Sequence, residues 1–133
     1  MIRRFLSFTA IALLFLALAA PVRAEESDFV LGRFLTCQKI VDREPVGETS
    51  SFPKETVKVY AFIEALDVVK DTDVKIQWLF EGKQTAMIEL TLGTSKRWRT
   101  FSSKRIGLRR GSWEVRLLDG QDNILRSLKF TVS

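Results

Sequence analysis

The sequence predicts an all-β fold, and three observations support this prediction. After residue 24, most segments alternate apolar and polar residues with a period of two. Residues that favour turns, mainly Gly, Pro, Asp and Asn, separate these segments at intervals of roughly 8–12 residues. No segment after residue 24 repeats its apolar residues with the period of a helix. We therefore expect an immunoglobulin-like antiparallel β-sandwich of about seven strands, preceded by an N-terminal signal helix.

Residues 1–24 have the features of a secretory signal peptide. Arg3 and Arg4 precede a largely apolar run over residues 5–20, and a site of the A-x-A type ends at Ala24. The apolar run is shorter than the about 20 residues that usually span a membrane. We therefore expect cleavage after Ala24 and a periplasmic or secreted protein. An uncleaved segment, which would anchor the domain to the membrane, is the alternative.

Cleavage would also change the charge balance of the chain. Three of the 21 basic residues would leave with the signal, so that 18 would face 16 acidic ones and the net charge would fall from +5 to about +2. The mature chain is long enough for one domain and too short for two. We expect a short lead-in over residues 25–34 and a single β-sandwich domain over 35–133. Export argues against nucleic acid as a partner.

Histidine is absent from the chain, and Cys37 is its one cysteine. Catalytic sites of the Ser-His-Asp and Cys-His types, and zinc sites held by histidine or by several cysteines, are therefore excluded. We expect no metal and no cofactor. Cys37 lies in an apolar run, so we expect it to be buried; a disulfide with another chain is the alternative.

Loops and turns separate the expected strands. Residues 42–54, with Pro45, Gly47 and Pro53, are expected to form a loop, and 67–73, with three aspartates, a turn. Glu81-Gly82 and Asp119-Gly120 indicate further turns. The segments expected to be strands are 34–41, 56–65, 74–80, 85–92, 97–103, 112–118 and 124–132.

Alternation also predicts where the aromatic residues of these strands lie. Trp78 and Trp113 alternate with charged or polar neighbours and are expected in the core. Tyr60 and Phe62 fall opposite the aliphatic face of the strand at 56–65, which makes them the better candidates for an exposed stacking platform.

Residues 96–110 form the most distinctive stretch, with seven basic residues and no acid between Glu89 and Glu114. Arginine side chains on one face of a strand can bind carboxylate or phosphate through paired hydrogen bonds. The stretch therefore predicts an anion-binding surface with aromatic support. The alternative is that its arginines pair with acids of neighbouring strands and its tryptophan is core. The candidate ligand-binding residues are Arg97, Trp98, Arg99, Phe101, Lys104 and Arg105.

A second charged segment, Asp42-Arg43-Glu44, precedes Pro45. Arg43 and Glu44 are candidates for a secondary ligand clamp; the alternative, which we favour, is a loop ion pair with Arg97 or Arg99. Catalysis by Asp42 and Glu44 has no acid–base pair at a recognisable spacing to support it, so we expect no catalytic residues and no enzyme.

Three weaker motifs have ordinary structural explanations. Ser51-x-x-Lys54 matches the spacing of β-lactamase-type sites, but Pro53 disfavours the helix that this chemistry requires. Two groups of acidic and amide residues could gather on calcium, but they lie in turns, where such residues are expected for backbone reasons. These groups are Asp67, Asp71 and Asp73, and Asp119, Asp122 and Asn123.

Several short blocks resemble a bacterial domain family of unknown function, found in exported and envelope-associated proteins and often as the C-terminal module. They are R-E-P-V-G at 43–47, F-P at 52–53, K-V-Y at 58–60, R-W-R-T-F-S-S-K at 97–104 and G-S-W-E-V at 111–115. The resemblance covers about residues 35–132. This family often has a histidine near the strand of Trp78 and a tryptophan where this chain has Phe101; neither is present. The resemblance implies an extracytoplasmic β-domain and brings no activity.

These observations together lead to one expectation about function and one alternative. We expect a non-enzymatic extracytoplasmic module that binds an anionic glycan or lipid of the envelope, or a protein partner, through the basic and aromatic strand. The alternative is a structural or assembly domain of an envelope complex, with no small ligand.

Overall fold

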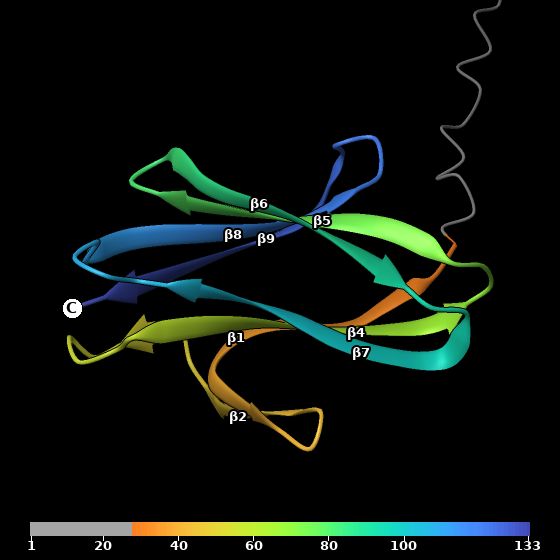
Figure 1. Ribbon diagram of the computed structural model, residues 1–133, viewed down its shortest axis with the longest axis horizontal. Coiled ribbons are helices and arrows are strands. Elements are labelled where there is room, and N and C mark those ends of the chain that lie inside the picture. Colours follow the sequence, from red (N-terminus) through yellow and green to blue (C-terminus); the bar gives the residue numbers. More distant parts are fainter. Residues whose placement is uncertain (1–27) are drawn as a thin grey trace, which may run out of the picture.

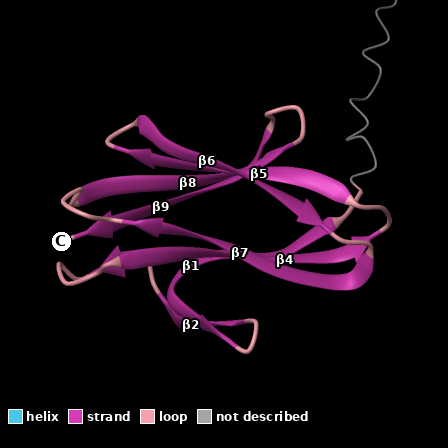
Figure 2. Ribbon diagram, viewed as in Figure 1, coloured by secondary structure: helices cyan, strands magenta, loops and turns pink. Residues whose placement is uncertain are grey.

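The computed structural model describes residues 28–133, and this part of the chain is built from strands and loops alone (Figure 1, Figure 2). The expected signal helix over residues 1–24 lies outside the described residues. No helix in the described part is long and apolar enough to cross a membrane. The strands are β1 (Val30–Val41), β2 (Glu44–Glu48), β3 (Ser51–Phe52), β4 (Lys58–Val68), β5 (Thr72–Phe80), β6 (Lys83–Leu92), β7 (Ser95–Arg105), β8 (Gly111–Asp119) and β9 (Ile124–Val132).

The strands form two sheets that face each other, as Figure 1 shows. One sheet has the order β2-β1-β4-β7 and the other β3-β9-β8-β5-β6. All neighbours are antiparallel except β3 and β9, which are parallel. The expectation of an all-β sandwich is therefore confirmed.

The core lies between the sheets and is built from the aliphatic and aromatic residues that alternate along the strands. Trp78 and Trp113 are both in it, as expected. The Trp113 and Phe130 rings stack with their centroids 5.8 Å apart, and Phe130 meets Trp78 edge-on at 6.1 Å. The Trp78 indole N–H donates a hydrogen bond of 3.1 Å to Ser102 Oγ, which joins the two sheets through the middle of the core.

The prediction of a loop over residues 42–54 is wrong in part, because this segment contains β2 and β3. Asp42 and Arg43 both have a positive φ, of 50° and 63°, and make the tight turn that returns β2 along β1. Two-residue turns of this kind usually contain glycine, and here no glycine marks the turn. β1 also begins at Val30 rather than at residue 34.

The end of β1 departs from its own sheet. Pairing between β1 and β4 stops at Cys37 opposite Tyr60, and of the described strands only β2 pairs with residues 39–41. The hairpin of β1 and β2 therefore stands out from the face of the sheet that points away from the core, as seen below β4 and β7 in Figure 1. We call that face the outer face; it is where the functional candidates gather.

Candidate functional site

A groove of about 620 Å³ lies between the β1–β2 hairpin and the outer face of β4 and β7. We call it the basic groove. It takes residues from three places that are far apart in the sequence: the hairpin, the start of β4 and the middle of β7. Its lining residues are Ile40, Asp42, Arg43, Lys58, Tyr60, Phe62, Arg97, Trp98, Arg99, Thr100, Phe101 and Ser103.

The register of β4 and β7 decides which side chains face the groove. Phe62 lies opposite Phe101, and Tyr60 lies opposite Ser103. Because neighbouring strands in register present matching faces, Arg97, Arg99, Phe101 and Arg105 share the outer face. Phe101 is 44% exposed, and its ring centroid lies 5.7 Å from that of Tyr60. The result is an accessible aromatic pair on the groove floor.

A network of two arginines and two glutamates ties the hairpin to the sheet. Glu44, on β2, accepts hydrogen bonds from Arg33 on β1 at 3.0 Å and 3.1 Å and from Arg99 on β7 at 2.5 Å. Arg33 also donates to Glu64 on β4 at 2.8 Å. The ion pair expected between Glu44 and Arg97 or Arg99 is therefore confirmed, with Arg99 as the partner.

Hydrogen bonds in this network change the acidity of its members. Hydrogen bonding from Arg33 and then Arg99 lowers the pKa of Glu44 from 4.5 to about 2. The bond from Arg33, with a smaller contribution from the charge of Arg97, lowers the pKa of Glu64. Both carboxylates stay ionised at neutral pH, so Arg99 is held in place at the groove wall.

Other cations of the groove are left without an acidic partner. Arg43, Lys58 and Arg97 line the groove, and none of them makes an ion pair with a described residue. Arg105, on the same face beside Lys58, is also unpaired within the described part of the chain. Asp42 is the acid among the lining residues. The groove therefore carries an excess of unpaired positive charge.

Two of the six residues predicted to bind ligand point the other way. Lys104 lies opposite Val59, on the face of β7 that turns toward the second sheet. Trp98 borders the groove, but its indole packs on Gly93, where a Cβ would come within 2.5 Å of the ring. Trp98 is 38% exposed; it lies at the rim of the sandwich, neither in the core nor on the groove floor.

Phe62 is not the exposed platform that the alternation favours. It is only 1% exposed, and the guanidinium of Arg33 lies 4.8 Å from the centroid of its ring. Cys37 is fully buried on the same side of the sheet, in agreement with the sequence analysis. The reason is that the β1–β2 hairpin and the ion-pair network cover this part of the outer face, and alternation alone cannot predict that cover.

The remaining motifs have structural roles. Asp71 accepts hydrogen bonds from the backbone and side chain of Thr94, and Asp119 from the backbone of Gln121 and Asn123. Asp119 thus stabilises its own turn, and Asp71 joins the β4–β5 connection to the β6–β7 connection. No group of acidic residues within 28–133 is arranged to hold a metal ion. Ser51 belongs to the short strand β3, so its spacing to Lys54 is not helical.

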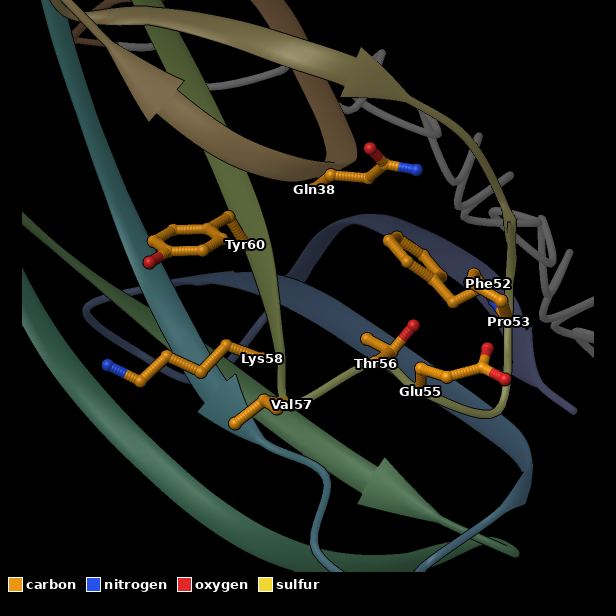
Figure 3. A pocket seen from close by; sticks show the side chains of 8 residues that line it. All are labelled: Gln38, Phe52, Pro53, Glu55, Thr56, Val57, Lys58 and Tyr60. Atoms are coloured by element: carbon orange, nitrogen blue, oxygen red, sulfur yellow. The ribbon is translucent and has the colours of Figure 1, made fainter.

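A second hollow, of about 420 Å³, adjoins the basic groove at the start of β4. We call it the side hollow. Figure 3 shows Gln38 above it, Phe52 and Pro53 along one side, and Tyr60 and Lys58 along the other. Tyr60 and Lys58 line both depressions. The side hollow has no signal in the sequence, because it forms only where β1 leaves β4.

Comparison with known proteins gives a family match without an activity. Residues 71–132 match the model of the family described as "Protein of unknown function (DUF2914)". This agrees with the expected resemblance to a family of unknown function. The match covers β7 and leaves out β1, β2 and the start of β4, which supply the rest of the groove. No curated protein sequence matches the chain.

Two solved structures of a β-glucosidase from Listeria innocua, in complex with glucose and with isofagomine, are similar in shape to part of the chain. The TM-scores are 0.44 and 0.42, each at 6% sequence identity. The matches cover 79% and 78% of this chain and 16% of each glucosidase. This likeness is too weak to assign a fold family, an activity or a ligand.

Proposed function

We propose that this protein is a non-enzymatic binding module that holds an anionic ligand, a glycan or a lipid head group, in the basic groove. The observation that carries the proposal is the combination of unpaired cations around an aromatic pair in which Phe101 is exposed and Tyr60 is half-buried. Arg43, Lys58 and Arg97 have no acidic partner among the described residues, and Phe101 and Tyr60 lie between them.

The groove is suited to an anion for two physical reasons. A forked guanidinium can bind a carboxylate or phosphate with two parallel hydrogen bonds. An aromatic ring beside the guanidinium offers apolar surface to the uncharged part of the same ligand. The hydroxyl of a tyrosine also leaves a hydrogen-bonding group at the edge of that surface. Arg99, fixed by Glu44, is already ordered, so it loses little side-chain entropy on binding.

Titration with a panel of anions tests the proposal. The panel contains oligogalacturonides, dextran sulfate, and vesicles of phosphatidylglycerol in phosphatidylcholine. We expect Arg97→Ala to weaken binding about tenfold or more, because it removes a charge-assisted contact. Arg126→Ala, which removes an exposed cation from the other sheet, is the matched control and should bind as the wild type does.

Two results would overturn this proposal: no binding of any probe by the wild type, or equal binding by wild type and Arg97→Ala. Arg99→Ala is less informative, because it also breaks the link between β7 and the hairpin. Added salt should weaken binding, since the cations of the groove are solvent-exposed or half-buried.

A structural or assembly role is the second candidate, and the free edge of β7 favours it. β7 has 11 residues and, among the strands of residues 28–133, pairs only with β4, so its other edge can accept a strand from a partner. Its basic residues also protect such an edge against unwanted pairing. Recovery of one stoichiometric envelope protein at high salt, together with no binding of the anion panel, would favour this role.

We further propose that the chain is exported to the periplasm or secreted and that its sandwich is immunoglobulin-like. The order β9-β8-β5-β6 facing β1-β4-β7, with connections that cross between the sheets, supports the second point. The composition of residues 1–24 supports the first. Mass spectrometry of the protein from its native host should find Glu25 as the first residue; an intact Met1 would mean a tethered domain instead.

A further inference from the structure

We infer that the ligand is an acidic oligosaccharide, long enough to occupy the basic groove and the side hollow together, with Tyr60 under its middle. This inference rests on the proposed function and names the chemistry and length of its ligand. It starts from the position of Tyr60 and Lys58, which line both depressions, so that the two adjoin at these side chains. We call the two depressions together the trough.

The two parts of the trough differ in chemistry. The basic groove, at about 620 Å³, holds the unpaired cations; the side hollow, at about 420 Å³, has the amide of Gln38, the hydroxyl of Thr56 and the carboxylate of Glu55. Each volume alone is in the range that holds one small ligand. A monosaccharide would therefore leave one part empty, and the part that it should fill first is the basic groove.

The floor of the trough argues for a sugar chain over a peptide. β4 supplies most of the shared floor. Its backbone pairs with β7 along its length and with β1 as far as Tyr60, so that at the start of β4 only Lys58 and Val59 lack a β1 partner among the described residues. Extended peptides bind sheets at a free edge, where unpaired backbone groups are available. A ligand on the face of β4 can be recognised only by side chains. An aromatic plane, amide and hydroxyl groups, and guanidinium forks suit a chain of hydroxylated rings that carry carboxylates.

The test compares galacturonate with its dimer and tetramer by calorimetry on the purified protein. We expect the tetramer to bind at least about tenfold more tightly than the monomer, because its added units gain contacts without a second loss of translational freedom. In Thr56→Trp the new indole is expected to fill part of the side hollow, whose lining does not include Arg43, Arg97 or Phe101 of the basic groove. This variant should lose most of the advantage of the tetramer and bind the monomer as the wild type does.

The monomer measurement also shows whether the variant is folded, because it needs an intact basic groove. Glu55→Trp, at an exposed position of the same hollow, is the second variant if Thr56→Trp is unstable, and it should have the same effect. Equal affinity for monomer and tetramer in the wild type, or a tetramer advantage that both variants keep, would overturn the inference and leave the anion-binding function standing. Binding of acidic peptides in place of every sugar would also overturn it. Failure of all the anions would overturn the proposed function itself.

Discussion

Ser102 shows how much a single polar side chain can contribute to this fold. It is one of two buried polar residues in the described part of the chain, the other being Thr36. Its hydroxyl accepts the hydrogen bond of the Trp78 indole, whose side chain is fully buried. A buried donor without a partner costs more than the net value of the hydrogen bond, because it has lost its hydration. Ser102 therefore allows a tryptophan in the centre of the core.

Ser102→Ala should lower the free energy of unfolding by about 1–3 kcal/mol, since the indole N–H would lose its partner. Urea unfolding followed by fluorescence measures this. Ser103→Ala is the matched control, because its side chain is exposed and on the other face of the same strand; it should change the stability by less than about 0.5 kcal/mol. Equal effects of the two changes would contradict the role given to Ser102.

Glu44 makes stability depend on pH in a defined direction. Its pKa in the folded protein is lowered from 4.5 to about 2, chiefly by Arg33 and next by Arg99. A carboxyl with a lowered folded pKa stabilises the protein above its unfolded pKa, and this stability is lost as the pH falls through the folded value. The melting temperature of Glu44→Gln should therefore lie below that of the wild type above pH 4.5, and the gap should close near pH 2.

Thermal unfolding over this pH range, followed by circular dichroism, measures the gap. Glu55→Gln is the control, since Glu55 is exposed and forms no ion pair with any residue from 28 to 133. It should show no such gap. A gap for Glu44→Gln that stays constant from pH 4.5 to 2 would mean that its carboxylate does not act through these arginines.

The β1–β2 hairpin is the element that turns an ordinary sheet face into a groove. It forms one wall through Ile40, Asp42 and Arg43, and its far strand carries Glu44 to Arg99. The same hairpin and network cover the region of Cys37 and Phe62. The hairpin is held to β7 by an ion pair whose members are about half-exposed or less, and partly exposed pairs are individually weak. We therefore expect the groove wall to open locally without unfolding of the core.

The reactivity of Cys37 toward a thiol reagent should report this opening. In the wild type the thiol is fully buried, and burial raises its pKa, so labelling should be slow. Glu44→Ala should speed labelling about two- to tenfold, because the hairpin loses its links to Arg33 and Arg99. Glu89→Ala, an exposed change on β6 in the other sheet, should leave the rate as it is. An unchanged rate in Glu44→Ala would show that Glu44 does not hold the hairpin closed.

At the scale of the whole molecule, the two sheets share one core, and neither is complete without the other. The inner faces of β4 and of β5, β8 and β9 meet in a single cluster of buried residues. The three tryptophans divide between the sheets, with Trp98 on β7 and the others on β5 and β8. Loss of one sheet would expose the apolar face of the other, so the sheets must unfold together.

Denaturation of a protein prepared from Glu25 onward should therefore be a single cooperative transition. Tryptophan fluorescence and far-ultraviolet circular dichroism should give the same midpoint, as expected for one domain of this size. Two separated midpoints would contradict a shared core.

Period-two alternation by itself predicts the seven main strands, the burial of Trp78 and Trp113, and the sandwich class. The reason is that successive side chains of a strand point to opposite faces, and the apolar ones are buried on folding. Glu44 and Arg99 are 55 positions apart, yet Arg99 is one of the two partners that the ion-pair alternative names. Arg33, which also bonds to Glu44, is not among them. Alternation also places Trp98 on the face opposite Arg97. Only the tertiary structure decided that a turn at Asp42 and Arg43 lifts a hairpin off the sheet, and that Phe62 is covered and Phe101 is not. These outcomes depend on where β1 stops pairing with β4 and on the register of β7, which are properties of contacts between distant segments. The groove is a product of those contacts, so no single stretch of the chain predicts it.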